Sequence, residues 1–226
     1  MTTTTSTTTT LTPTTICVFC GSSPGTNPLY AAAARDLGRA IARRGLGLVY
    51  GGGTHGLMGA VANAAHDAGA PVLGFIPQAM TQFEGLLPVG EMHLVPDMHT
   101  RKRRMAEEAG AFIALPGGFG TLEELFEMLT WSQLAIHRKP IGILNTDGFY
   151  APLLALIDRA VQDGFIRPQA RGLLVVRDTV DELMEAVMAF EDAPAGARYG
   201  LDWTSDGSGK KVAPPDHGKK GGVVDV

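Results

Sequence analysis

Residues 115–124 read Leu-Pro-Gly-Gly-Phe-Gly-Thr-Leu-Glu-Glu, and this stretch joins an apolar run at 111–115 to a helical pattern. That order predicts a strand, a glycine turn and a helix that begins near Thr121. Three glycines within four residues allow a ligand to approach the main chain closely. A helix start presents unpaired N–H groups and partial positive charge, so the turn favours an anion such as phosphate. The acids Glu123 and Glu124 follow directly, which indicates chemistry on a phosphorylated substrate.

Short apolar strands alternate with helical patterns on both sides of this stretch. Strands are predicted at 16–20, 46–50, 71–76, 93–95, 111–115, 140–144 and 173–176. Helices are predicted at 28–44, 56–68, 98–109, 121–135, 149–162 and 180–190. This alternation is typical of an α/β protein, with an open, doubly wound parallel sheet and helices on both faces.

Both ends of the chain differ from its middle. Residues 1–15 are nearly all threonine, and residues 191–226 are rich in Gly, Lys and Asp. Neither composition can build a packed core, so both segments are predicted to be disordered tails. The threonine-rich start also lacks the basic and apolar regions of a secretory signal. Residues 16–190 are therefore predicted to form a single domain.

Charge and composition exclude several classes of protein. A net charge of −4 gives no electrostatic footprint for nucleic acid, and no apolar run approaches the roughly 18 residues that a membrane span needs. Cys17 and Cys20 form a C-x-x-C, but strand residues three apart point to opposite faces of a sheet. Buried, reduced thiols are the better interpretation than a redox motif. The sequence therefore predicts a soluble, cytoplasmic protein.

Unusual sequences follow four of the predicted strands. They are Gly21-Ser22-Ser23, the glycine-rich loop 51–59, the segment 97–102 and the stretch 115–124. In a doubly wound sheet, ligands bind beyond the carboxyl ends of the strands. The four segments are therefore expected to converge on one cleft and to form an active site.

Each of these segments also has a structural interpretation. Gly51-x-Gly53-x-x-Gly56 matches a dinucleotide fingerprint, but the next strand ends at Pro77 without the acid that binds the ribose. Thr121 and Glu124 fit a capping box, in which Glu124 would bond back to the helix start. Arg101 and Lys102 could belong to a solvated helix face. The pairs His93/His99 and His55/His66 lack metal-site spacing, so no metal is predicted.

The stretch 116–124 resembles the P-G-G-x-G-T-x-x-E signature of the LOG ("Lonely Guy") family, often labelled lysine decarboxylases. Cys20-Gly21-Ser22-Ser23, the loop 51–59 and the segment 98–102 resemble that family's motifs in the same order, and the resemblance covers residues 16–190. It implies a Rossmann-like homodimer, with the site near the subunit interface. It also implies hydrolysis of the N-glycosidic bond of N6-modified adenosine 5′-monophosphates, without metal or organic cofactor. His55 departs from the family's pattern.

The resemblance assigns roles to individual residues. Glu124 is implied as the carboxylate that stabilises an oxocarbenium-like state and activates water, and Arg101 as the second catalytic residue. Glu123 is the second candidate for the acid. The remaining substrate-binding residues are implied to be Ser22, Gly52, Gly53, Thr54, Gly56, Met98, Lys102, Gly117, Gly118, Gly120 and Thr121. Met98 would pack against adenine. The loop with Met80, Phe83 and Glu84 leaves the preferred N6 substituent open.

Two alternative functions remain. A lysine decarboxylase would use pyridoxal phosphate, which needs a lysine for its Schiff base. Only Lys102 and Lys139 lie within residues 16–190, and neither follows a recognisable cofactor-binding pattern. The other alternative is a non-catalytic nucleotide carrier or sensor that uses the same phosphate cradle.

Overall fold

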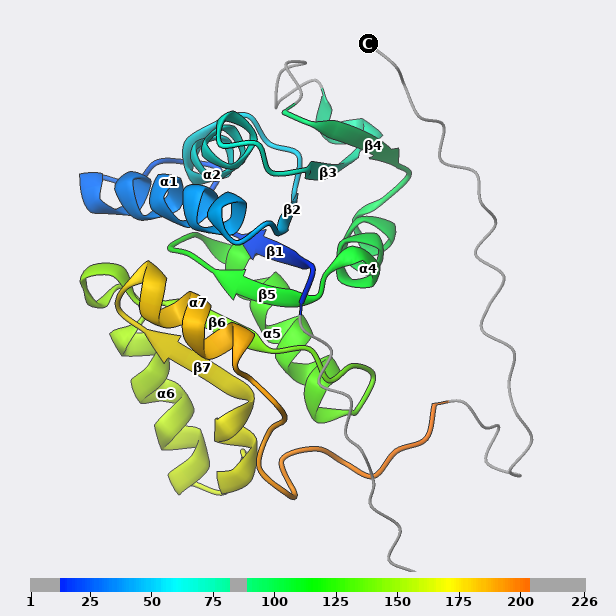
Figure 1. Cartoon of the computed structure of the whole chain (residues 1–226). Helices are drawn as coiled ribbons and strands as arrows, with labels where there is room; N and C mark the ends of the chain where they lie inside the picture. The colour runs from blue at the N-terminus through cyan, green and yellow to red at the C-terminus, as the bar shows by residue number, and fades with distance from the viewer. Residues whose placement is uncertain (1–12, 82–88, 204–226) are drawn as a thin grey trace, which may run out of the picture.

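The computed structural model describes residues 13–81 and 89–203, which contain one parallel sheet in the order β4-β3-β2-β1-β5-β6-β7 (Figure 1). Every neighbouring pair of strands runs parallel. The strands are β1 (Thr15–Phe19), β2 (Gly47–Tyr50), β3 (Val72–Pro77), β4 (Glu91–Val95), β5 (Ala111–Ala114), β6 (Ile141–Leu144) and β7 (Leu174–Arg177). This topology confirms the predicted doubly wound fold.

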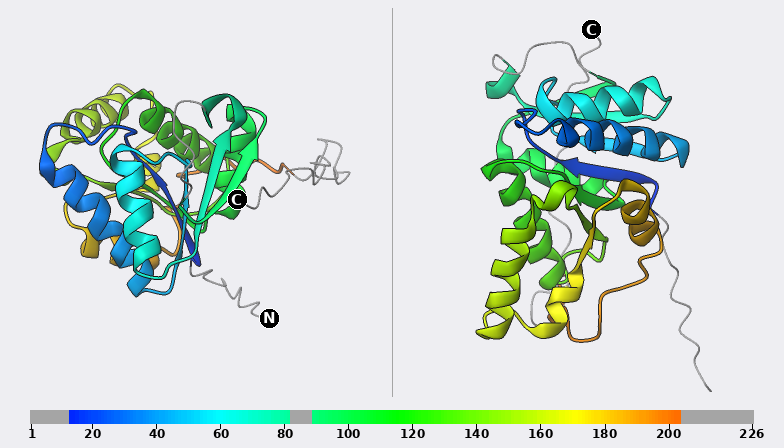
Figure 2. Two further views of the ribbon diagram at one scale, coloured as in Figure 1. Left: turned by 90° about the horizontal axis from the view of Figure 1, so that it is seen from above. Right: turned by 90° about the vertical axis from the view of Figure 1, so that its left-hand side faces the viewer.

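Helices cover both faces of the sheet (Figure 2). The first face carries α1 (Pro28–Arg43), α2 (Gly56–Asp67) and α7 (Val180–Met188), and the opposite face carries α4 (Met98–Glu108), α5 (Phe119–Gln133) and α6 (Ala151–Gln162). Short 3₁₀ turns lie at η1 (Gln78–Met80), η2 (Thr146–Gly148) and η3 (Pro168–Leu173). The two layers confirm the prediction that helices lie on both faces.

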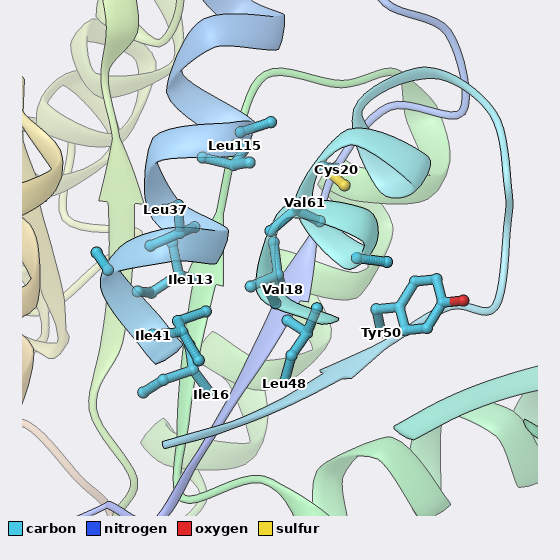
Figure 3. Packing of buried hydrophobic residues seen from close by; sticks show 14 of the residues in the cluster. Ile16, Val18, Cys20, Leu37, Ile41, Leu48, Tyr50, Val61, Ile113 and Leu115 are labelled. Atoms are coloured by element: carbon cyan, nitrogen blue, oxygen red, sulfur yellow. The ribbon is translucent and has the colours of Figure 1, made fainter. Parts of the chain in front are cut away.

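The central strands β1, β2, β5 and β6 are buried on both sides, because each contributes to two hydrophobic clusters. Ile16, Val18 and Cys20 of the β1 region pack toward α1 and α2 (Figure 3). Cys17 and Phe19 point to the other cluster, which includes residues of α4 and α5. The two cysteines are therefore free, buried and on opposite faces of the sheet, as the strand periodicity predicts.

Several helices begin at the signals that the sequence carries. The Asn27 side chain accepts a hydrogen bond from the Leu29 amide at 3.0 Å, directly before Pro28 opens α1. Asp97 caps α4 by accepting from the Thr100 amide at 2.7 Å. Side-chain oxygens at these positions satisfy amides that the first helical turn leaves unpaired. The Asp97 cap fixes where α4 starts, and therefore which strand end its first turn faces.

The described part of the chain extends past both predicted boundaries. β1 begins at Thr15, whose hydroxyl accepts a hydrogen bond from the Gly110 amide at 3.0 Å. At the other end, residues 191–203 of the predicted tail are described, and Ala197 is fully buried against Ala170 and Leu173. The expectation of disorder therefore differs from the structure in this segment, because a few apolar and charged side chains anchor it.

Three predictions fall on residues outside the described ranges. These are the threonine-rich tail up to residue 12, the loop residues Phe83 and Glu84, and the tail from 204 to 226. Within the ranges that are described, none of the helices is both long and apolar enough to span a bilayer.

Candidate active site

The strand order reverses at β1, which has β2 on one side and β5 on the other. At the carboxyl end of these strands the Gly21 amide donates to the Pro116 carbonyl at 3.0 Å, and the Leu57 amide donates to the Gly21 carbonyl at 3.0 Å. Gly56 has a φ of +59°, and a Cβ there would lie 2.3 Å from the Ser22 carbonyl carbon. The structure thus joins three of the four predicted segments at the switch point.

The glycine turn leads into α5 two residues earlier than predicted. Gly118 is the N-cap, in an extended conformation, and α5 begins at Phe119. Thr121 therefore lies in the first turn and Glu124 in the second, so the proposed capping box is wrong. The Thr121 side chain instead packs on the turn, because a Cβ on Gly117 would lie 2.1 Å from its hydroxyl oxygen. The exposed Gly118 and Gly120 leave the first amides of α5 accessible to an anion.

Arg101 and Glu124 form a buried ion pair across α4 and α5. The Arg101 Nη1 lies 3.6 Å from the Glu124 Oε1, and their side chains are 8% and 9% exposed. Two carbonyls at strand ends hold the guanidinium: Nε donates to Phe75 at 3.2 Å and Nη2 donates to Gly51 at 3.3 Å. A Cβ on Gly51 would lie 1.8 Å from Nη2, so this contact requires glycine. The structure brings together the two residues predicted to be catalytic.

The environment of Glu124 shifts its titration. Burial raises the pKa of this carboxyl to about 6, although the nearby Arg101 guanidinium acts in the opposite direction. Glu123 adds to the rise through charge repulsion, while the Lys102 ammonium opposes it. A carboxyl whose pKa lies near neutrality can exchange a proton with substrate or water. The geometry is therefore suited to general acid–base chemistry.

Lys102 and Glu123 lie beside this pair and contact each other. The Lys102 ammonium forms ion pairs with Glu123 and with Glu127, the latter at 3.1 Å. Burial lowers the pKa of Lys102, but hydrogen bonds to the two glutamates outweigh burial and raise it. The predicted substrate contacts of Lys102 and Glu123 are thus already engaged with protein groups in this structure.

A cavity of about 300 Å³ lies next to the glycine turn. Ser22, Gly117 and Gly118 line it, together with the aromatic residues Tyr30 and Phe149. Met98 lies at the start of α4, with its sulfur 3.7 Å from the Arg101 Nη1 and its side chain 40% exposed. The predicted phosphate cradle therefore borders an open cavity, and the predicted adenine contact borders the ion pair.

The glycine loop after β2 splits between two environments. Gly52 and Gly53 are buried, and Gly52 packs against Ile76 with a φ of +79°. Thr54 and Gly56 line a different groove, of about 530 Å³, over α1 and α2. The structure therefore does not bring all members of the loop into the cavity beside Gly117.

Three residues of this region were missed by the sequence reasoning. Tyr30 and Phe149 line the cavity, and their rings meet edge to face with centroids 5.6 Å apart. Phe149 follows the carboxyl end of β6, a position that indicates proximity to the switch point. Glu127 lies four residues after Glu123, so helical spacing could have placed both acids on one face of α5.

Neither a metal cluster nor a dinucleotide acid accompanies these groups. Among residues 13–81 and 89–203, no three His, Cys, Asp or Glu side chains are grouped so that they could hold a metal ion. β3 ends at Pro77, and Gln78 rather than an acid follows it.

Comparison with known proteins places the chain in a family. A family model described as "possible lysine decarboxylase" matches residues 58–187. The chain is 50% identical over 188 residues to the probable cytokinin riboside 5′-monophosphate phosphoribohydrolase LOGL3 of Oryza sativa subsp. japonica, covering 83% of this chain and 89% of that one. The chain belongs to the LOG family. A second LOG relative, the cytokinin riboside 5′-monophosphate phosphoribohydrolase LOG7 of Arabidopsis thaliana, is 52% identical over 177 residues, which are 78% of this chain and 82% of the relative.

Solved structures resemble this LOG family chain in fold. The Moco carrier protein of Chlamydomonas reinhardtii is similar with a TM-score of 0.57 and 22% identity, over 76% of this chain and 94% of that protein. The molybdenum cofactor binding protein of Rippkaea orientalis has a TM-score of 0.57 and 20% identity, with the same coverage. At this level of identity the similarity concerns the arrangement of strands and helices.

Proposed function

We propose that this LOG family chain hydrolyses the N-glycosidic bond of N6-modified adenosine 5′-monophosphates, and of AMP itself, to the free base and ribose 5-phosphate. The observation that carries the proposal is the buried Arg101–Glu124 pair beside a glycine turn at the switch point. The relatives named as phosphoribohydrolases, at 50% and 52% identity over most of their length, support it.

One group of residues would bind the substrate, and a second group would cleave the bond. The amides at the start of α5, the Thr121 hydroxyl and Ser22 would bind the 5′-phosphate, because a helix start attracts anions and Ser22 lines the cavity beside the glycine turn. Gly52, Gly53, Thr54 and Gly56 of the loop after β2 would complete the substrate site; Gly52 and Gly53 are buried, and Thr54 and Gly56 are partly exposed. Met98 is exposed beside the guanidinium and would pack on the adenine ring.

Glu124 and Arg101 carry the chemical step. As the bond between the sugar carbon C1′ and the purine nitrogen breaks, its electrons stay on the purine and C1′ becomes cationic. The ionised Glu124 stabilises that cation and takes a proton from the attacking water, whose oxygen bonds to C1′. The proton then passes to the purine. The Arg101 guanidinium offsets the negative charge that develops on the departing base.

The two lysines of residues 16–190 do not favour a Schiff-base enzyme. Lys102 is held between glutamates, and the Lys139 ammonium donates to the Ala106 carbonyl at 2.6 Å. Neither lysine lines the cavity beside the glycine turn. The proposed reaction therefore uses this chain's own side chains, and no cofactor is invoked.

A homodimer in the cytoplasm is the form that we propose for the protein. Support for the dimer comes from the family and from exposed apolar residues on α5. Phe119 is 92% exposed and Phe126 is 39% exposed, and because they are seven residues apart they lie on the same face of the helix. Free, buried Cys17 and Cys20 are compatible with a reducing compartment. Light scattering at assay concentration should give twice the mass of one chain. A monomeric mass would contradict the dimer.

The decisive experiment is incubation of the protein with AMP and, separately, with isopentenyl-AMP. We expect release of the free base and ribose 5-phosphate, measured by chromatography, from at least one of the two nucleotides. Tight binding of nucleotide without release of either product would instead support a carrier or sensor. Comparison of the two rates would also show whether an N6 substituent is preferred.

A further inference from the structure

Lys102 connects the two helices that carry the catalytic pair. It follows Arg101 on α4, its side chain is only 8% exposed, and its ammonium lies between two acids of α5. Those acids, Glu123 and Glu127, are one helical turn apart, and Glu124 is the immediate neighbour of the first. Two adjacent cations on α4 therefore meet three carboxylates on α5.

This arrangement fixes how α5 faces α4. Arg101 is tied to the strand ends through the Phe75 and Gly51 carbonyls, so its position does not depend on α5. The contact between Arg101 and Glu124 is a 3.6 Å ion pair, longer than a hydrogen bond, and cannot by itself fix the carboxyl tightly. The two contacts of Lys102 supply that constraint, because both of its partners are on the same helix as Glu124.

We propose that Lys102 is a positioning residue that holds Glu124 against Arg101 by bridging Glu123 and Glu127, and that it does not bind the substrate phosphate. The ammonium also offsets two negative charges that would otherwise repel the ionised Glu124. The inference rests on the proposed function for its turnover measurements only.

The charged and titratable groups that face Glu124 come from three elements. They are Arg101 and Lys102 of α4, Glu123 and Glu127 of α5, and the buried thiols Cys17 and Cys20 at β1. Burial and the neighbouring Glu124 raise the pKa of both thiols, so they remain neutral. Loss of the Lys102 charge would therefore leave Arg101 as the one cation of this group opposing three carboxylates.

The test compares Lys102→Met, Lys102→Arg and a control, Lys139→Met, by two measurements. The first is the titration of the Glu124 carboxyl, followed by ¹³C NMR of glutamate-labelled protein and assigned by its loss in Glu124→Gln. The second is the pH dependence of kcat with AMP. Lys139 is a suitable control because its ammonium also contacts α4, at the Ala106 carbonyl, but it has no acid of α5 as a partner.

Lys102→Met should raise the pKa of Glu124 by on the order of one unit and move the acid limb of kcat to higher pH by the same amount. It should also lower kcat about tenfold through misplacement of the carboxyl. Lys102→Arg should restore most of the wild-type Glu124 pKa and of kcat. Lys139→Met should change neither the Glu124 pKa nor kcat. An unchanged Glu124 titration together with a KM for AMP raised tenfold or more would overturn the proposal and make Lys102 a phosphate ligand.

A further variant covers the case in which Lys102→Met fails to fold. Lys102→Met combined with Glu123→Gln and Glu127→Gln removes all three charges of the Lys102 ion pairs, so that no buried charge is left without a partner. It should bind AMP within about twofold of wild type but retain a lowered kcat, whereas a tenfold loss of AMP affinity would overturn the proposal. If wild type binds AMP without cleaving it, the proposed function fails, and the NMR titration still tests the role of Lys102 by itself.

Discussion

Glu124 lies in an environment that opposes its ionised form, yet the proposed reaction needs that form. Removing a carboxylate from water is costly, and a single ion pair with Arg101 offsets only part of that cost. The pKa of about 6 reflects this balance. A carboxyl with this pKa is largely ionised at neutral pH and still basic enough to take a proton from water.

The first prediction concerns the substitution Glu124→Gln, which keeps the shape of the side chain and removes its charge. Turnover of AMP should fall between roughly a hundredfold and ten-thousandfold, the range that general acid–base catalysis contributes. Binding of AMP, measured by calorimetry, should remain, because the proposed phosphate contacts lie at the glycine turn and do not involve Glu124. Normal turnover by this variant would show that another group carries the chemistry.

The second prediction concerns stability as a function of pH. The pKa of Glu124 is higher in the folded state, about 6, than its ordinary value of 4.5, so the folded state binds the proton more tightly. Below the pKa of Glu124 in the unfolded state, the carboxyl is protonated in both states and its ionisation costs nothing. Above the pKa in the folded state the cost is fully present, so the unfolding free energy falls as pH rises between the two pKa values. Relative to wild type, Glu124→Gln should gain about 2 kcal/mol in unfolding free energy between about pH 4 and pH 7. The unfolding free energies are measured by denaturant titration at a series of pH values. If the unfolding free energies of the two proteins changed with pH in the same way, the prediction would be contradicted.

At the scale of single elements, the turn before α5 shows that its glycines have different roles. Gly117 is packed so closely that a Cβ would lie 2.1 Å from the Thr121 hydroxyl and 2.9 Å from the Gly21 amide nitrogen. A Cβ on Gly120, by contrast, would meet nothing within 4 Å. Gly117 is therefore required for packing, whereas Gly120 lies in the open first turn of a helix.

The third prediction follows from this difference. Gly117→Ala should lower the unfolding free energy by about 1–3 kcal/mol, because the added methyl group displaces Thr121 and the β1 end. Gly120→Ala should raise it by about 0.5–1 kcal/mol, since alanine is the better helix former and has room. Chemical denaturation of the two variants provides the measurement. Equal effects of the two substitutions would refute the assignment.

The start of α5 also shows where sequence reasoning failed at this scale. Thr121 was predicted as the cap because threonine and the following acid fit a capping box. The backbone instead turns at Gly118, which has no side chain to cap the helix, and α5 begins at Phe119. Leu125 and Met128 then pack on the sheet, and this rotation directs Glu124 inward to Arg101.

At the scale of the whole molecule, residues 191–203 return to the end of α5 as an anchored segment. The Trp203 Nε1 donates to the Leu134 carbonyl at 2.7 Å, and the Tyr199 amide donates to the Gln133 carbonyl at 2.8 Å. The Arg167 guanidinium lies 4.1 Å from the centre of the Tyr199 ring. The two hydrogen bonds satisfy carbonyls that the last turn of α5 leaves unpaired.

The fourth prediction compares two truncations of this segment. A chain that ends at Phe190 should lose about 1–3 kcal/mol of stability, from the lost hydrogen bonds and cation–π contact. At this chain length each kcal/mol corresponds to roughly 2–4 °C in Tm, which calorimetry resolves. A chain that ends at Trp203 keeps every contact described above and should match the full-length protein. Equal Tm values for both truncations would show that the segment adds no stability.

The sequence by itself determined the doubly wound fold and the glycine turn, and its resemblance to the LOG family singled out Arg101 and Glu124 as the candidate catalytic residues, with Glu123 as the second candidate acid. Strand and helix periodicity follow from local side-chain pattern, and strand ends in a parallel sheet share an edge whatever the details of packing. Only the tertiary structure decided which carboxylate faces the guanidinium and which one Lys102 engages. That choice depends on the rotation and separation of α4 and α5, and these are set by packing on the sheet, which no local pattern encodes.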